Sequence, residues 1–452
     1  MAGISVVDRS SLASTSRLGA EFYHPAKLSS LSKLAGIRSC LVRDCFSVIK
    51  ASVAPRSEIV NDAFIFDLTD AADGLMREGT NLNNFAELGS AKKLFKRGDV
   101  LISRLRPYLR EICLVSSKAK ILLGSTEFIV LRQKSDILPE YLLAFLLTNE
   151  VQNILLWSQE GTNHPRFPET VLIDLPIPIM EQRQQHEIAD MIRTAVEKID
   201  NSRVLYAQAQ QAVLEVTGFS NFDLEQSPFY AVTLSEANAV GRMDAEHFQP
   251  KYKLLLDHLR KTAGAKTLGE LVTEPIRRGV QPEYVENGKV LALNSRYVGL
   301  QFIDIVNAER ANEGFWQLNE RARARRLDVV MNSTGWGTIG RANCVLHDEE
   351  TVVDNHVSII RPDGAVCDPR YLAVYLSSAL GLMQTNKWLT GSSGQVELYP
   401  AAISRFVIAL PDRKFQAQVA DMVMWAYAAR QKAKTLIEEA KQLVEDFIAG
   451  AG

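Results

Sequence analysis

Residues 17–25, RLGAEFYHP, and residues 242–250, RMDAEHFQP, share arginine, alanine, glutamate and proline at identical spacing. Further matches follow in the same order along both halves of the chain. RGDVLIS at 97–103 corresponds to RLDVVMN at 326–332, and FIVLR further on corresponds to SIIR. Each match is short, but their shared order over half the chain indicates an internal duplication, and this duplication decides the fold.

The composition is that of a folded protein without a bulk charge. The chain has 452 residues, of which 46% are hydrophobic and 23% charged, as in globular proteins rather than disordered or fibrous ones. At about 150 residues per domain, this length predicts about three domains, or two large ones with a segment between them. Lys and Arg number 51 against 53 Asp and Glu, which gives a formal net charge of -2. Any surface that binds nucleic acid must therefore carry its positive charge locally.

Cysteine usage and the N-terminus point to an intracellular setting. Cys40, Cys45, Cys113, Cys344 and Cys367 form no C-x-x-C pair, and their odd number cannot pair completely within the chain. This favours a reducing cytoplasm. The first residues lack the apolar core of a signal peptide, and no run of about 18 apolar residues occurs. We therefore expect a cytoplasmic protein that does not span a membrane.

Each half has the same expected order of elements. Short strand-like runs separated by Gly, Pro, Asn and Ser come first. One apolar helix is predicted at 139–157 and its counterpart at 369–389, each starting with proline. A loop and a short strand then lead into a long segment without proline. These patterns predict an α+β protein with a mixed α/β domain in each half.

The two long segments, 181–217 and 413–448, carry a seven-residue apolar stripe over about four heptads. The stripe residues are Ile192, Ala195, Ile199, Ser202, Tyr206, Ala209, Val213 and Val216 in the first segment, and Val423, Ala426, Arg430, Ala433, Ile437, Ala440, Val444 and Phe447 in the second. Each helix could pack on its own domain. We favour packing of the two helices on each other, because they are equally long and each ends a repeat.

The sequence has no recognisable catalytic motif. It contains no P-loop, H-E-x-x-H, G-x-S-x-G or N-P-P-Y motif, so we expect neither catalysis nor a metal centre. GWGTIG at 335–340 satisfies G-x-G-x-x-G, but a strand-like run follows it where a dinucleotide site needs a helix. We interpret it as a tight turn between two strands that brings Thr334, Thr338 and Arg341 to a surface.

Basic and polar loops recur at matching places in both halves. RLRPYLR at 104–110 interleaves arginine with tyrosine, and the loops at 161–169 and 391–400 form the clearest matching pair. The planar guanidinium group of arginine can donate two hydrogen bonds to guanine. Arginine and lysine both neutralise the charge of phosphate. Solvated surface charge is the alternative, above all for RARARR at 321–326. The candidate DNA contacts are Lys92, Lys93, Arg104, Arg106, Tyr108, Arg110, His164, Arg166, Arg277, Arg278, Arg296, Thr334, Trp336, Thr338, Arg341, Ser392, Ser393 and Gln395.

The order of these motifs resembles the specificity (S) subunit of Type I restriction-modification systems. The resemblance rests on RMDAEHFQPKY, GDVLIS and DVVMNSTGWGTIGR, STEFIVLR and VDNHVSIIRP, and the glycine loop leading to LPIPIMEQRQQHEIADMI. It covers essentially the whole chain in two copies. Two departures are SRLRPYL in place of the glycine-rich turn in the first half, and DRKFQAQVADMV at the start of the second long helix.

The resemblance implies two target recognition domains, at 1–179 and 219–411, each reading one half of a split double-stranded DNA site. Two long antiparallel coiled-coil helices, at 180–218 and 412–452, would hold them apart. A helix of about 37 residues is about 55 Å long, which spans at least one turn of B-DNA, roughly 34 to 36 Å. Because the two loop sets differ, the target should be bipartite and asymmetric.

The resemblance also implies partners. Two modification subunits would dock on the helices and methylate adenine with S-adenosylmethionine, which they and not this chain would bind, and restriction subunits would join to cleave. The chain itself would be non-catalytic. Two other hypotheses stay open: a duplicated coiled-coil scaffold that does not touch DNA, which suits the neutral charge, and a DNA-modifying enzyme, for which no cofactor motif is found.

Overall fold

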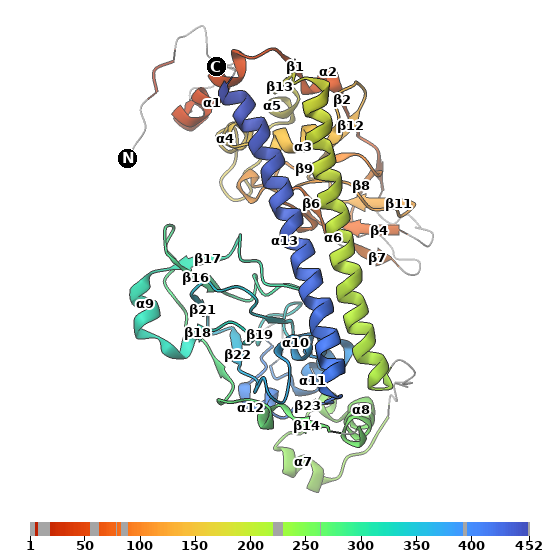
Figure 1. The fold of residues 1–452 in the computed structure, drawn as a ribbon. Coiled ribbons are helices and arrows are strands. Elements are labelled where there is room, and N and C mark those ends of the chain that lie inside the picture. Colours follow the sequence, from red (N-terminus) through yellow and green to blue (C-terminus); the bar gives the residue numbers. More distant parts are fainter. Residues whose placement is uncertain are drawn as a thin grey trace. The chain divides into compact units, whose positions relative to one another are not determined.

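The fold consists of two units that each contain part of both long helices. A computed structural model describes residues 5–7, 19–54, 63–77, 79–82, 89–219, 229–262, 264–391 and 396–450. Unit 1 comprises residues 1–200 and 430–452, and unit 2 comprises residues 201–429. The helices α6 (Gln182–Val216) and α13 (Arg413–Gly450) run through both units (Figure 1). Among the described residues, no helix is both long and apolar enough to cross a membrane.

A four-stranded antiparallel sheet lies at the centre of unit 1. Its order is β10-β9-β12-β2, with β2 (Phe46–Val48), β9 (Val100–Ser103), β10 (Ile112–Leu114) and β12 (Phe128–Gln133). Side chains of successive strand residues point to opposite faces. Val100 and Ile102 belong to the core on one face, whereas Leu101 belongs to a second core on the other. Burial on both faces explains why these strands read as continuous apolar runs.

A second sheet of unit 1 contains one parallel strand pair. Its order is β3-β8-β11-β4-β7, and β4 and β11 run parallel. The remaining elements of unit 1 are α1 (Pro25–Ala35), β1 (Ser39–Leu41), α2 (Val42–Cys45), β3 (Ser52–Val53), β4 (Ala63–Phe66), β5 (Ala71–Ala72), β6 (Leu75–Met76), β7 (Thr80–Leu82), β8 (Lys92–Phe95), η4 (Pro107–Leu109), β11 (Ile121–Gly124), α3 (Pro139–Leu147), α4 (Asn149–Leu156), α5 (Glu169–Ile173) and β13 (Pro176–Pro178).

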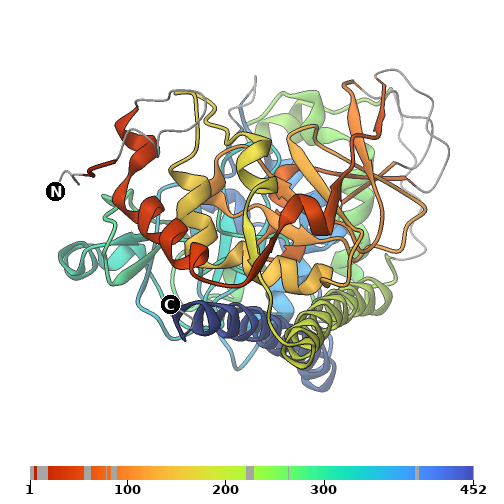
Figure 2. The same ribbon diagram turned by 90° about the horizontal axis from the view of Figure 1, so that it is seen from above.

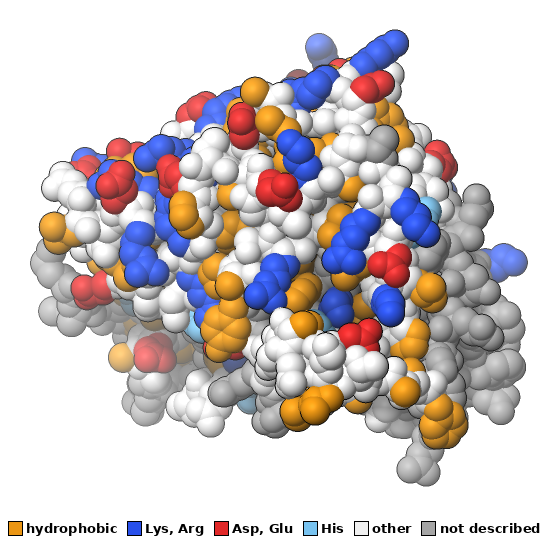
Figure 3. All heavy atoms as spheres, turned by 90° about the horizontal axis from the view of Figure 1, so that it is seen from below, with side chains coloured by type: hydrophobic (Ala, Val, Ile, Leu, Met, Phe, Trp, Pro, Cys, Tyr) orange, Lys and Arg blue, Asp and Glu red, His pale blue; other side chains and the backbone are white. Residues whose placement is uncertain are grey.

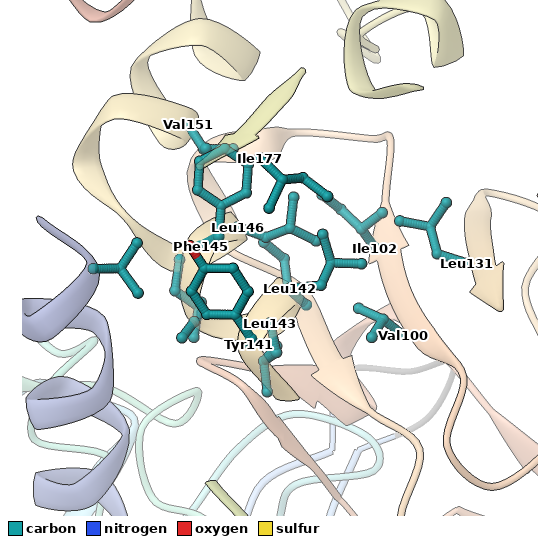
Figure 4. Packing of buried hydrophobic residues seen from close by; sticks show 14 of the residues in the cluster. Val100, Ile102, Leu131, Tyr141, Leu142, Leu143, Phe145, Leu146, Val151 and Ile177 are labelled. Carbon is teal, nitrogen blue, oxygen red and sulfur yellow. The ribbon is translucent and has the colours of Figure 1, made fainter. Parts of the chain in front are cut away.

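The prediction of a single apolar helix at 139–157 is wrong, because the structure divides this segment into two helices, α3 and α4. Thr148 adopts an extended backbone, with ψ of 151°, and its hydroxyl accepts from the backbone of Val151 at the start of α4. A threonine side chain that caps a helix competes with helix continuation in this way. The counterpart at 369–389 is divided in the same way at Ser378. Figure 4 shows α3 placing Tyr141, Leu142 and Phe145 among the other apolar side chains of the unit 1 core.

Unit 2 repeats this architecture. Its sheets have the orders β15-β22-β19-β20 and β17-β16-β21-β18, and β16 and β21 are again a parallel pair. The elements are α7 (Leu234–Val240), α8 (Pro250–Lys261), β14 (Lys266–Thr267), β15 (Arg277–Arg278), β16 (Val290–Leu293), β17 (Glu309–Ala311), α9 (Glu313–Leu318), β18 (Arg323–Ala324), β19 (Val329–Asn332), β20 (Ala342–Cys344), β21 (Thr351–Val353), β22 (Val357–Ile360), α10 (Pro369–Ser377), α11 (Ala379–Trp388), α12 (Pro400–Ile403) and β23 (Val407–Ile408). The predicted duplication and α+β class are confirmed.

Matching residues of the two halves make matching contacts. Asp99 accepts two hydrogen bonds from Arg132, at 2.8 and 2.7 Å, and Asp328 accepts two from Arg361, both at 2.8 Å. In each half this ion pair joins the start of one central strand to the end of its neighbour. The buried hydroxyl of Tyr141 likewise donates to the carbonyl of Pro178 at 2.8 Å, as that of Tyr371 does to Ala409 at 2.7 Å.

The two long helices pack on each other and on their domains. In unit 1 the stripe from Ile192 to Ile199 shares one core with residues 433–448 and with the domain's sheet. In unit 2 the hydroxyl of Ser202 donates to the carbonyl of Ala426 at 2.7 Å. Figures 1 and 2 show the helices side by side. The antiparallel pairing is confirmed, and both proposed packing modes occur together.

The predicted stripe fails at three positions. Val216 is 41% exposed, because it lies at the end of α6, and Arg430 and Phe447 are only partly buried. Thr217, which follows Val216, and Ile448, which follows Phe447, are buried instead. A straight α-helix drifts by about 20° per heptad against a strict seven-residue repeat, so the buried face shifts by one residue along a long helix.

Candidate nucleic-acid interface

In unit 1, the connection between β9 and β10 presents an aromatic side chain to solvent. We call residues 104–111 tip loop 1. Arg106 and Arg110 have left-handed backbones, with φ of 48° and 49°, on either side of the short helix η4. Pro107 anchors η4 because it is buried, whereas the side chain of Tyr108 is 55% exposed. The loop is therefore held by its proline and displays its tyrosine.

Glu127 holds two of the predicted arginines. Its carboxylate accepts from Nη2 of Arg166 at 2.7 Å and from Nε of Arg104 at 2.8 Å. Hydrogen bonds from Arg166 and then Arg104 hold the pKa of Glu127 at about 2, below its ordinary 4.5. Both guanidinium groups stay partly exposed. The cluster thus carries one net positive charge, with both planar groups fixed in orientation.

A second loop of unit 1 lies against tip loop 1. We call residues 160–168 flanking loop 1. Leu105 and Arg166 form an antiparallel bridge, and the backbone N–H of Arg106 donates to Pro165 O at 2.9 Å. Exposed His164 lies in this loop, and its carbonyl accepts from Arg166 at 2.9 Å. The structure therefore brings together the predicted residues of tip loop 1 and flanking loop 1.

The two predicted lysines lie in β8 and differ in position. The ammonium group of Lys93 donates to the carbonyl of Phe128, the residue after Glu127. Burial, and then the charge of Lys50, lower the pKa of Lys93. Lys92 precedes it in the strand, so its side chain points to the other face of the sheet. Of the two, Lys93 adjoins the Glu127 cluster.

In unit 2, the predicted turn between β19 and β20 is confirmed. We call residues 333–341 tip loop 2. Gly335 and Gly337 have φ of 91° and 88°, which only glycine adopts without strain. Between them, Trp336 is 75% exposed. Thr338 and Arg341 are half-buried, and the guanidinium of Arg341 donates to the carbonyl of Gly337 at 3.1 Å, which closes the turn.

The two tip loops are built on the same backbone contacts with different side chains. The backbone N–H of Arg104 donates to Glu127 O at 3.1 Å, and that of Ser333 donates to His356 O at 2.8 Å. Glu127 and His356 occupy corresponding positions before β12 and β22. Where the carboxylate of Glu127 holds arginines, Nδ1 of His356 lies 2.7 Å from the hydroxyl of Thr334.

A flanking loop also adjoins tip loop 2. We call residues 390–398 flanking loop 2; Ser392, Ser393 and Gln395 lie outside the described residues. In unit 2, Glu397 forms antiparallel β-bridges with Thr334 and with Thr390. In unit 1, Arg166 forms the corresponding β-bridges with Leu105 and with Glu160. The same pair of loops thus meets in both units.

The remaining predicted arginines of unit 2 separate into two groups. Arg278 adjoins both loops of unit 2, because its guanidinium donates to Ser333 O of tip loop 2 at 3.4 Å and lies 3.6 Å from the carboxylate of Glu397 in flanking loop 2. It also lies 5.1 Å from the ring of Tyr399. Exposed Arg296 follows Ser295, whose carbonyl accepts from Asn332 at the end of β19. Arg277 instead pairs with Glu274 at 2.6 Å, on the other face of its strand.

Sequence reasoning did not identify Glu127, His356, Glu397 or Tyr399. The sequence did contain an indication for Glu127 and His356, because STEFIVLR and VDNHVSIIRP align and place these two residues at corresponding positions. On the face drawn in Figure 3, Lys and Arg side chains lie among Asp and Glu side chains rather than in one continuous basic area. This agrees with a net charge close to zero.

The fold and loops define a duplicated α+β protein that presents two matching but chemically different loop clusters. In sequence, the chain is 30% identical over 150 residues to the Type I restriction enzyme HindI specificity subunit of Haemophilus influenzae. That match covers 31% of this chain and 32% of the relative, about a third of its length. It confirms the resemblance to Type I specificity subunits that the motifs indicate. No protein-family model matches the chain.

Two solved structures align over most of the chain at low sequence identity. The Type I restriction-modification S subunit from M. genitalium is 13% identical with a TM-score of 0.39, covering 91% of this chain and 94% of that one. The HsdS subunit from Thermoanaerobacter tengcongensis is 17% identical with a TM-score of 0.30, covering 92% and 96%.

Proposed function

We propose that this chain is the DNA sequence-specificity subunit of a Type I restriction-modification complex and has no catalytic activity of its own. In this proposal, residues 1–179 and 219–411 are two target recognition domains. The single observation that carries this proposal is that a tip loop and a flanking loop meet in both units. In each unit the tip loop presents an exposed aromatic residue, and an arginine lies beside it. Such a combination suits contact with phosphates and base edges.

The chemical difference between the loops supports an asymmetric target. Unit 1 offers the guanidinium groups of Arg104 and Arg166, held by a carboxylate, with Tyr108 at the tip. Unit 2 offers hydroxyl and imidazole groups with Trp336 at the tip. Arginine favours guanine, whereas threonine hydroxyls pair with several bases. We infer two different half-sites separated by a fixed gap.

The long helices are the proposed docking surfaces for two modification subunits, which would bind S-adenosylmethionine and methylate adenine. Restriction subunits would join this complex in the cytoplasm. Support comes from the length of α6 and α13, 35 and 38 residues, of which only one side is needed for the mutual packing. The outer sides keep polar and apolar groups such as Trp425, which is exposed.

The test is salt-dependent DNA binding. The chain is co-purified with its modification subunit, and its affinity for random duplex DNA is measured from low to high salt. We expect the logarithm of the affinity to fall linearly with the logarithm of salt concentration. A flat dependence would overturn the proposal and favour a scaffold that does not touch DNA. Methyl transfer by the chain alone, with labelled S-adenosylmethionine, would contradict the non-catalytic role.

A further inference from the structure

A cavity lined by arginine lies in unit 2 at the end of β19 opposite to tip loop 2. Its volume is about 430 Å³. β19 begins at Val329 beside this cavity and ends at Asn332 beside the tip loop. The arginines that line the cavity are Arg325, Arg326, Arg361, Arg370 and Arg413. The cavity belongs to neither of the loop clusters described above.

The carboxylates of the cavity are already neutralised. Asp328 and Asp368 are the acidic residues in its lining, and both are buried. Asp328 is held by Arg361, and Asp368 accepts from Nε and Nη2 of Arg370 at 3.0 and 2.8 Å. Carboxylates outside the lining hold two more of the arginines: Arg326 donates to Asp348 at 3.0 and 3.1 Å, and Arg361 also pairs with Glu274. Among the described residues, Arg325 and Arg413 are the lining arginines without a carboxylate within hydrogen-bond distance.

Two of the arginines keep capacity for a further anion. Arg413, the first residue of α13, donates to the side-chain oxygen of Gln416 at 3.1 Å and to the carbonyl of Gly364 at 2.9 Å. Both acceptors are neutral. Arg325 is exposed, and the carboxylate of Glu320 lies 3.8 Å from its guanidinium, beyond hydrogen-bond distance.

Two of the lining arginines, Arg370 and Arg413, have no basic counterpart in unit 1. The ion pair of Asp328 and Arg361 recurs there as Asp99 and Arg132. In contrast, the second residue of α10 is Arg370, while the second residue of α3 is Glu140. α13 begins at Arg413, while α6 begins at Gln182. Lys96 and Arg97 of unit 1 stand at the positions of Arg325 and Arg326, so Arg370 and Arg413 are what unit 2 adds to the positive charge of this region.

We propose that this cavity of unit 2 binds a phosphate group. Planar guanidinium groups match the oxygens of phosphate in pairs, and a partly enclosed site strengthens their attraction relative to open water. The group could belong to a nucleic-acid backbone or to a free phosphate compound. The proposal does not depend on the function proposed above, because it follows from the cavity alone.

Inorganic phosphate is the first probe. It is titrated into the full chain at constant ionic strength, with chloride as the reference ion, and binding is followed by calorimetry and by the melting temperature. The variants are Arg413→Gln, which installs the residue found at the start of α6, and Arg325→Gln. Lys414→Gln is the matched control, because it removes one exposed charge from the neighbouring residue outside the cavity lining.

We expect phosphate to bind the wild-type chain and Lys414→Gln equally, and to bind Arg413→Gln about tenfold more weakly, since one charge-assisted hydrogen-bonding group is lost. Arg325→Gln should weaken binding in the same direction. Phosphate binding no stronger than that of chloride, or binding that neither cavity variant changes, would overturn the proposal.

Duplex DNA distinguishes the two sources of phosphate. If a backbone phosphate occupies the cavity, Arg413→Gln lowers the slope of log affinity against log salt by about 1, whereas Lys414→Gln leaves it unchanged. If the slope is the same in both variants while inorganic phosphate binding is lost, the site serves a free phosphate compound. A wild-type chain that shows no salt dependence would refute the DNA-binding proposal and leave the phosphate result standing.

Discussion

Replacing Trp336 with alanine should weaken DNA binding at one half-site without unfolding the protein. A tryptophan side chain buries about 200 Å² when fully covered. Trp336 is 75% exposed, so about 150 Å² is available to DNA, and contact with one face of the ring covers about half of this. At about 25 cal/mol per Å² the loss is about 2 kcal/mol, or about 30-fold in affinity. The smaller exposed fraction of Tyr108, 55%, predicts a loss of about eightfold for Tyr108→Ala.

The assay compares a duplex with both half-sites against duplexes in which one half-site is scrambled, in fluorescence anisotropy at fixed salt. Scrambling the half-site read by residues 219–411 should abolish the effect of Trp336→Ala, and scrambling the other should abolish that of Tyr108→Ala. Leu318→Ala is the control, because Leu318 is 85% exposed at the end of α9 and belongs to none of the four loops. Equal losses on all duplexes, or the same loss in the control, would refute the assignment of the tips to separate half-sites.

Three further predictions concern stability and pH. Tyr141→Phe removes a buried hydroxyl that bonds a backbone carbonyl, so it should lower the free energy of unfolding by about 1–2 kcal/mol in urea denaturation, whereas Tyr108→Phe, at an exposed tip, should leave it unchanged. Gly98→Ala should cost about 1 kcal/mol in the same assay, because φ is 89° there while no atom lies within 4 Å of the added methyl group, which makes the cost one of backbone strain alone. Glu127 has a pKa of about 2, lowered from 4.5, so its ion pairs stabilise the fold above pH 4.5 and lose this effect as the pH falls toward 2. Stability curves of the wild type and Glu127→Gln should therefore converge over that range, and parallel curves would contradict the assigned ion pairs.

The sequence was sufficient to predict the duplication and the long helices, because both depend on local patterns. Gly98 and Leu327 show which backbone conformations a local pattern can and cannot predict. They correspond in the two halves, and both adopt a left-handed backbone, with φ of 89° and 68°. Glycine indicates this conformation directly. Leucine does not, and only the alignment of the halves would have predicted it.

Contacts that depend on strand register could not be predicted. The matches of Asp99 with Asp328 and of Arg132 with Arg361 are visible in the sequence, but the ion pair within each half follows from β9 and β12 lying side by side. The carboxylate of Glu127 is another case. This carboxylate neutralises part of the positive charge of Arg104 and Arg166. The sequence does not indicate this, because the three residues lie on segments that are distant in sequence and meet only in the folded protein.

The shared core of unit 1 has a consequence for synthesis. Ala433, Ala440 and Val444 of the last helix pack in the same core as Ile192 and Ile199. The ribosome therefore makes residues 1–200 of unit 1 with one side of their helix uncovered, and residues 430–450, which cover it, are made only after unit 2. Until then the nascent protein exposes an apolar stripe, which favours association with other chains or chaperones. A stop codon just before Arg413 would thus damage unit 1 as well as unit 2.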